Sequence, residues 1–187
     1  MSQAAASVEL GALKELIATP ELPGIGPGPR ANLPSLPQLN QKVDEYLQRT
    51  TLPSHVHPLI RSAVLLWHDY LGASHSLSQE IHNQDGSFLH GIMHRREPDY
   101  SNAKYWFHRV GLHPTFERLG ERVARKLDAA RQPELKNQLL PHGRWDPFAF
   151  VDACERAARS ESNGTARLLR EIQQLEMEAL FEHWCDA

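Results

Sequence analysis

Residues 87–110 constrain the fold most strongly, because they contain two helix-period runs separated by a proline. The first run places four apolar residues on one helix face: Phe88, Leu89, Ile92 and Met93. Pro98 cannot continue that helix, and Asp99 or Ser101 can then cap a second one. The expected core face of the second helix has four residues: Ala103, Trp106, Phe107 and Val110. Gly111 follows, where a left-handed residue commonly ends a helix, so the segment predicts an antiparallel helical hairpin.

Helical spacing continues through most of the chain, and no run has the period of a β-strand. Further helix starts are marked by a capping residue or a proline in the first turn: Ser35, His57-Pro58, His113-Pro114 and Asp146-Pro147. We expect one long helix over residues 58–82, a turn at residues 83–86 and irregular structure over residues 132–144. The sequence therefore predicts an all-α, single-domain bundle of about six to eight helices.

The N-terminal part has a different composition. A short helix is expected within residues 1–18, and residues 19–38 contain six prolines and three glycines. We predict that residues 19–38 form an extended arm on the surface, and that residues 39–187 form the helical domain. The motif GIGPG in this arm does not indicate a phosphate loop, because prolines remove the backbone donors such a loop uses. The arm can also reach a second copy, which makes a homo-oligomer one possible assembly.

Composition narrows the function classes. A net charge of −3 over 187 residues argues against a general nucleic-acid-binding surface. The first residues do not resemble a secretory signal, and no apolar run is long enough to span a bilayer. Two isolated cysteines do not form a disulfide framework, so we expect a cytoplasmic protein and no membrane partner. The unusual feature is histidine, with 11 copies spread along the chain.

Histidines also dominate the candidate site. His90 and His94 are one helical turn apart, so their imidazoles can share one metal ion. If residues 58–82 fold back on the hairpin, His75 arrives level with His94 as a third ligand. We therefore predict a divalent metal site, for an ion such as zinc, at His75, His90 and His94. The surrounding polar pocket is expected to include four more residues: Arg95, Glu97, Asp99 and Tyr105.

Other interpretations of these residues remain open. The histidines can instead form a buried hydrogen-bonded network with Glu97, Asp99 or Tyr105, or they can face solvent. The acids and arginines near residue 97 can bind an acidic substrate through an arginine fork. Such a run can equally connect the end of one helix to its neighbour. No glutamate follows His90, so the pair is not the HExxH motif of metalloproteases.

The run HGIMHRREPDYSNAKYWF, followed by RVG and HP, resembles a family of uncharacterised bacterial helical proteins. The resemblance is specific over residues 90–114, weakens over the flanking helices and fades before residue 40. It implies a bacterial helical protein and supplies no activity. His108 stands where the family usually has arginine.

Two function classes follow from these patterns. The first is a small-ligand-binding protein or enzyme that uses a histidine-rich polar pocket between the 58–82 helix and the 87–110 hairpin. The second is a non-catalytic domain that binds a protein partner. It rests on YSNAKYWFHRV, which looks like the second helix of a tetratricopeptide or Sel1-type unit. We favour the first class, because a scaffold does not need so many polar groups in one stretch.

Overall fold

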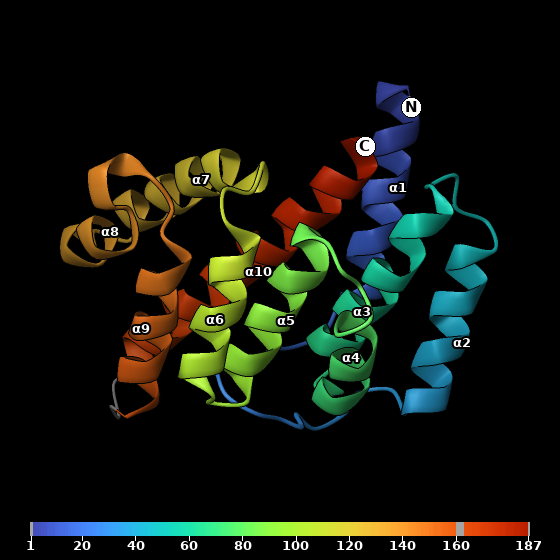
Figure 1. The fold of residues 1–187 in the computed structure, drawn as a ribbon, viewed down its shortest axis with the longest axis horizontal. Helices are drawn as coiled ribbons and strands as arrows, with labels where there is room; N and C mark the ends of the chain where they lie inside the picture. Colours follow the sequence, from blue (N-terminus) through green and yellow to red (C-terminus); the bar gives the residue numbers. More distant parts are fainter. Residues whose placement is uncertain (1, 160–162, 187) are drawn as a thin grey trace.

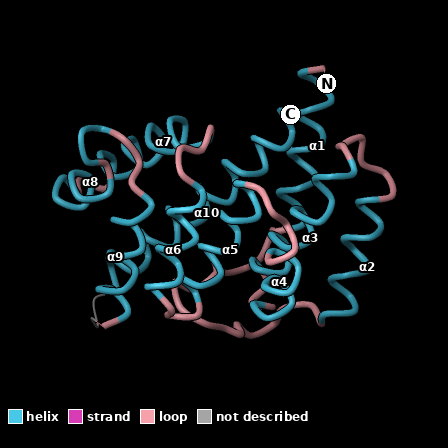
Figure 2. Tube along the Cα trace, in the orientation of Figure 1, coloured by secondary structure: helices cyan, strands magenta, loops and turns pink. Residues whose placement is uncertain are grey.

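The computed structural model describes residues 2–159 and 163–186, and every regular element in these ranges is helical (Figures 1 and 2). The described part of the chain has ten α-helices: α1 (Gln3–Leu16), α2 (Leu36–Leu47), α3 (His57–Trp67), α4 (Leu71–Ser78), α5 (Gln84–Arg96), α6 (Tyr100–Val110), α7 (Thr115–Ala129), α8 (Pro133–Leu139), α9 (Pro147–Ala158) and α10 (Asn163–Asp186). Two short 3₁₀ segments, η1 (Ser54–Val56) and η2 (Pro141–Gly143), complete the regular structure of the described ranges. The all-α prediction is confirmed, but six to eight helices was too few. None of the described helices is both long and apolar enough to cross a membrane.

The predicted hairpin is α5 and α6, which lie in the centre of the molecule (Figure 1). The Asp99 carboxylate accepts a hydrogen bond from the Asn102 backbone N–H at 3.2 Å, so Asp99 caps α6. Gly111 follows α6 with φ of 61°, a conformation that glycine adopts without strain. Helices α7, α8 and α9 lie on one side of the hairpin, and α1 to α4 lie on the other (Figure 1).

The long helix expected over residues 58–82 does not form. Helix α3 ends at Trp67, and α4 begins at Leu71. Between them Asp69 has φ of 66°, and its fully buried carboxylate pairs with Arg30 and Arg96. These two ion pairs hold Asp69 in a left-handed conformation that a continuous helix excludes.

Two other local predictions were wrong, because the structure has helix where the sequence suggested a turn or an irregular segment. Residues 83–86, expected to be a turn, instead cap and begin α5: the Asn83 side chain accepts a hydrogen bond from the Gly86 N–H at 2.8 Å. Residues 133–139, expected to be irregular, form α8 with Pro133 in its first turn.

Residues 17–35, here called the connector, run from α1 to α2 without helix or strand. The predicted surface arm is not free of the domain, because residues 24–26 of the connector contact buried groups. Ile25 is buried, the Gly24 carbonyl accepts a hydrogen bond from Gln173, and the Gly26 carbonyl accepts one from Arg96. The connector therefore crosses the molecule and supplies partners to buried groups of α5 and α10.

Two apolar clusters form the core of the described chain. The larger one joins α1 to α6 with Val151 of α9 and the C-terminal half of α10. The smaller one joins α7, α8 and α9 with Leu169, Ile172 and Ala179 of α10. Phe88 and Phe107, whose ring centroids are 5.6 Å apart, connect the two hairpin helices within the larger cluster. The apolar face of α5 is thus occupied by core packing, and its histidines face α4 and α6.

Candidate functional site

Three histidines lie together where α4 packs against α5. Each of His75, His90 and His94 offers a ring nitrogen, and these three atoms lie within 4.8 Å of one another. The rings of His90 and His94 are stacked with centroids 4.9 Å apart. The ring of His75 meets them edge-on, with centroids 4.7 Å from His90 and 5.2 Å from His94.

The break between α3 and α4 changes which histidines can meet. His68 precedes the break, and its Nδ1 lies 2.9 Å from the Val64 carbonyl, so it belongs to the end of α3. His82 lies beyond the end of α4 and is exposed. The helix expected over residues 58–82 is broken, yet His75 still reaches the α5 pair because α4 itself folds back on α5.

The most enclosed of the three is His90, which is 2% exposed. Its ring stacks on the indole of Trp106 with centroids 3.8 Å apart and an interplanar angle of 11°. Its Nδ1 is buried and has no hydrogen-bond partner. A buried imidazole nitrogen without a partner is costly, and a metal ion or a bound ligand would satisfy it.

Polar groups gather at His94, near the end of α5. The Asn102 side-chain amide lies 3.0 Å from Nε2 of His94. Carboxylate oxygens of Glu97 and Asp99 lie 3.5 Å and 3.9 Å from Nδ1. An acid beside the second ring nitrogen is the arrangement that fixes the orientation and tautomer of many metal-bound histidines.

The electrostatic environment of His90 and His94 favours their neutral imidazole forms. Burial, followed by the neighbouring rings of His94 and His75, lowers the pKa of His90 from 6.5 to about 4. Burial and the ring of His75 also lower the pKa of His94, although Glu97 and Asp99 act in the opposite direction. Neutral imidazole is the form that binds metals, so at neutral pH no proton competes for His90.

Two of the predicted pocket residues do not join the cluster. The Arg95 guanidinium is fully buried and pairs with Glu176 of α10, with Nη2 and Oε2 2.6 Å apart. It therefore cannot act as an arginine fork for a substrate. Tyr105 is 53% exposed and contacts the indole of Trp106, not a histidine of the cluster. The hydroxyl of Tyr105 favours solvent. Trp106, which we expected in the core, instead covers the His90 ring.

The sequence interpretation also missed Asn102 as a site residue. Asn102 and Trp106 are separated by one helical turn, so both project from the same face of α6 toward the histidines of α5. That spacing was visible in the sequence. Its meaning depended on knowing which face of α6 lies against α5.

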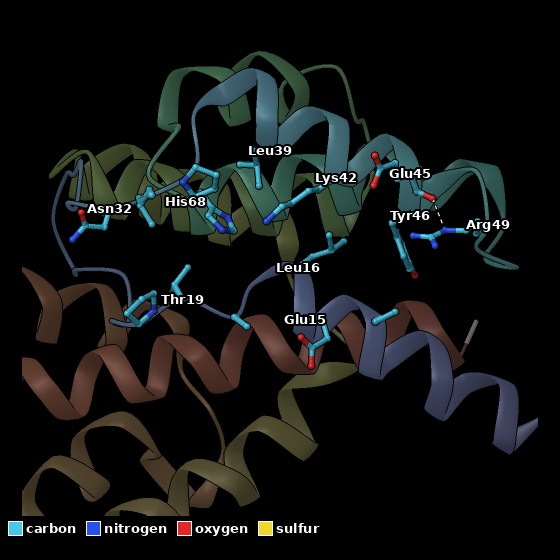
Figure 3. Close-up of a pocket in the computed structure, with 15 residues that line it drawn as sticks. Glu15, Leu16, Thr19, Asn32, Leu39, Lys42, Glu45, Tyr46, Arg49 and His68 are labelled. Atoms are coloured by element: carbon cyan, nitrogen blue, oxygen red, sulfur yellow. Dashed lines mark hydrogen bonds between the residues drawn. The ribbon is translucent and has the colours of Figure 1, made fainter.

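A cavity of about 470 Å³ lies elsewhere, between α1, the connector and α2 (Figure 3). Its charged lining is mixed, with Lys42 and Arg49 balanced by Glu15 and Glu45. The three clustered histidines do not line it. The cavity is thus separate from the site expected between residues 58–82 and the hairpin.

Comparison of the chain with models of protein families, with curated proteins and with solved structures finds no match. The function proposed below therefore rests on the side-chain geometry of this chain.

Proposed function

We propose that this protein binds a divalent transition-metal ion, such as zinc, through His75, His90 and His94. The observation that carries the proposal is the convergence of three imidazole nitrogens within 4.8 Å, with the buried Nδ1 of His90 lacking a partner. Two ligands come from consecutive turns of one helix and the third from its packed neighbour. Such a site brings its ligands close together before an ion binds.

The ligand atoms need only small movements to coordinate. Zinc–nitrogen bonds of about 2.0–2.1 Å in tetrahedral geometry place ligand nitrogens about 3.4 Å apart. Side-chain rotations at His75, which is half-buried, can close the difference. With Nδ1 of His94 beside Glu97 and Asp99, its Nε2 would be the ligand atom, and the Asn102 amide, now 3.0 Å from Nε2, would have to turn away.

Three histidine ligands leave one position of a tetrahedral zinc ion for water or a small anionic ligand. An ion bound here would lower the pKa of a coordinated water. Glu97 and Asp99, which lie beside Nδ1 of His94, would hold that imidazole in the tautomer whose Nε2 binds the ion. We propose a small-ligand-binding protein or a metal-assisted hydrolytic enzyme on this basis.

The direct test measures metal in protein purified without a histidine tag and dialysed against zinc. We expect His90→Ala and His94→Ala each to remove zinc from this site, measured by elemental analysis. The matched control is His82→Ala, which removes an exposed histidine close to the site in sequence and should leave the zinc content unchanged. Saturating zinc at 100 times its Kd should also raise the wild-type free energy of unfolding by about 2.7 kcal/mol.

The opposite outcome identifies the other function class. If zinc content is the same in wild type, His90→Ala and His94→Ala, these histidines do not bind metal. The two substitutions should then only destabilise the fold, by about 1–3 kcal/mol, by leaving polar partners unpaired. In that case a domain that binds a protein partner becomes the better proposal.

A further inference from the structure

A second group of potential ligands lies at the other end of α5. Asp85 comes from the first turn of α5, His113 from the loop before α7, and His183 from the last turns of α10. One ligand atom of each lies within 4.8 Å of the other two. Nε2 of His113 is 3.1 Å from Oδ1 of Asp85, and Nε2 of His183 is 3.7 Å from the same oxygen.

We propose that Asp85, His113 and His183 bind a second divalent transition-metal ion. Two imidazoles and one carboxylate are a donor set that suits first-row divalent metals, and in other proteins the same combination holds iron(II) with open coordination positions. The two separations from Oδ1 of Asp85, 3.1 Å and 3.7 Å, are close to those of neighbouring ligands around one ion, about 3 Å for metal–ligand bonds of about 2.1 Å.

The neighbours of His113 orient the correct nitrogen toward this point. Its Nδ1 lies 2.9 Å from the Thr115 hydroxyl oxygen and accepts from the Thr115 backbone N–H at 3.3 Å. In that tautomer Nε2–H donates to Asp85. A metal on Nε2 would require the proton on Nδ1, where the Thr115 hydroxyl could accept a hydrogen bond in place of the one that the Thr115 backbone N–H now donates.

Asp85 carries the negative charge that the site requires. Burial raises the pKa of its carboxyl, but the hydrogen bond from His113 and the nearby His183 ring are among the interactions that outweigh burial, so the pKa lies below its usual value. The carboxylate is therefore ionised at neutral pH and is available as a ligand.

An entry route lies beside His183. A cavity of about 220 Å³ is lined by six residues: Pro114, Thr115, Arg118, Ala179, His183 and Asp186. The His183 side chain is 31% exposed, whereas that of His113 is 1% exposed. An ion bound by these three residues would have open coordination positions on the side of the cavity, where water or a small anion can bind.

The two metal sites are independent. Asp85 and His90 are five residues apart on α5, which separates them by about 7.5 Å along the axis and by about 140° around it. One ion cannot bridge that distance with bonds of about 2 Å. The second site therefore does not depend on the function proposed above, and metal stoichiometry distinguishes the two.

The test is a cobalt(II) titration of tag-free protein by equilibrium dialysis with elemental analysis. We expect two bound ions in wild type and one in His183→Gln, while the exposed control His82→Gln keeps two. Far-ultraviolet circular dichroism checks that each variant is folded. Asp85→Asn, which removes the charge and keeps the side-chain shape, provides a second route to the same loss of one ion.

The outcomes separate the two sites. His183→Gln and Asp85→Asn that are folded and bind as much cobalt as wild type would overturn the second site, and these two residues would then only join α5 to α10. Loss of one ion in His183→Gln together with no loss in His75→Gln supports the second site and rejects the first. Wild-type protein that binds no cobalt rejects both.

Discussion

Two adjacent arginines on α5 show how strongly a single residue's role depends on its partner. Arg95 and Arg96 are each almost fully buried, but they face different groups. Arg95 pairs with Glu176 and lies 4.4 Å from the Phe150 ring centroid, whereas Arg96 pairs with Asp69. Buried ion pairs add little net stability, but removal of one partner is costly. These arginines therefore connect helices and do not bind substrate.

At the same scale, His90 should make stability depend on pH in metal-free protein. Its pKa is about 4 when folded and near 6.5 in an unfolded chain, so between these values only the unfolded state takes up the proton. Stability should therefore fall as pH decreases through this window, by about 2 kcal/mol between pH 7 and pH 5.

Urea unfolding in the presence of a chelator measures this effect at each pH. In the variant His90→Gln, the free energy of unfolding should no longer fall by about 2 kcal/mol between pH 7 and pH 5, even if the variant is less stable at pH 7. The groups around His90 are the rings of His75, His94 and Trp106, and they stay in place in the variant. An identical slope in both proteins would show that His90 is not neutral and buried.

At the scale of elements, α5 is unusual because all residues from Gly86 to Arg96 are buried. It packs against α3, α4 and α6, and Arg95 reaches α10. A helix enclosed on all sides has no face exposed to solvent, so its polar side chains must find partners inside the protein. The histidine cluster and the buried arginine pairs are both consequences of this position.

The backbone of Ile81 lies very close to Gly86 at the start of α5, which predicts that a larger residue is not tolerated at position 86. A Cβ at Gly86 would lie 2.2 Å from the Ile81 carbonyl oxygen, whereas a Cβ at Gly72 in α4 would contact nothing within 4 Å. Gly86→Ala should destabilise the protein by about 1–3 kcal/mol through overpacking. Gly72→Ala should stabilise it by about 0.5–1 kcal/mol, because alanine is the better helix former. Thermal unfolding measures the stability of both variants. Equal effects of the two substitutions would contradict the close contact between Gly86 and Ile81.

At the scale of the whole molecule, the connector holds together parts that are distant in sequence. The Asp69 carboxylate accepts hydrogen bonds from the backbone N–H and the side chain of Arg30, while Arg96 pairs with its other oxygen. The Arg30 side chain also donates to the carbonyls of Glu21 and Trp67. The connector is thus part of the packed structure.

This arrangement predicts a large effect of one connector residue. Arg30→Ala should lower the free energy of unfolding by about 3 kcal/mol, because it leaves a buried carboxylate with one partner fewer. The control is Arg61→Ala, which breaks a pair with Asp44 that is much more exposed and should cost less than about 1 kcal/mol. Urea unfolding measures both, and a similar small loss in each variant would mean that the connector is not anchored.

The sequence by itself determined features that depend on neighbours within a few residues. Pro98 and Asp99 determined the break between α5 and α6. The Asp146 cap is equally local, because its carboxylate accepts hydrogen bonds from the backbone N–H groups of Phe148 and Ala149. His90 and His94 share a face because the helical period is local. For the same reason the all-α class could be predicted from spacing alone.

Only the tertiary structure decided features that depend on distant partners. The helix break at Asp69 requires Arg30 and Arg96, which are 39 and 27 residues away. Arg95 is removed from the site by Glu176, at a separation of 81 residues. The Asp85 cluster likewise needs His113 and His183 from two other segments. Such contacts form when the packing of apolar faces brings distant helices together. The local sequence does not specify which charged groups then lie next to each other.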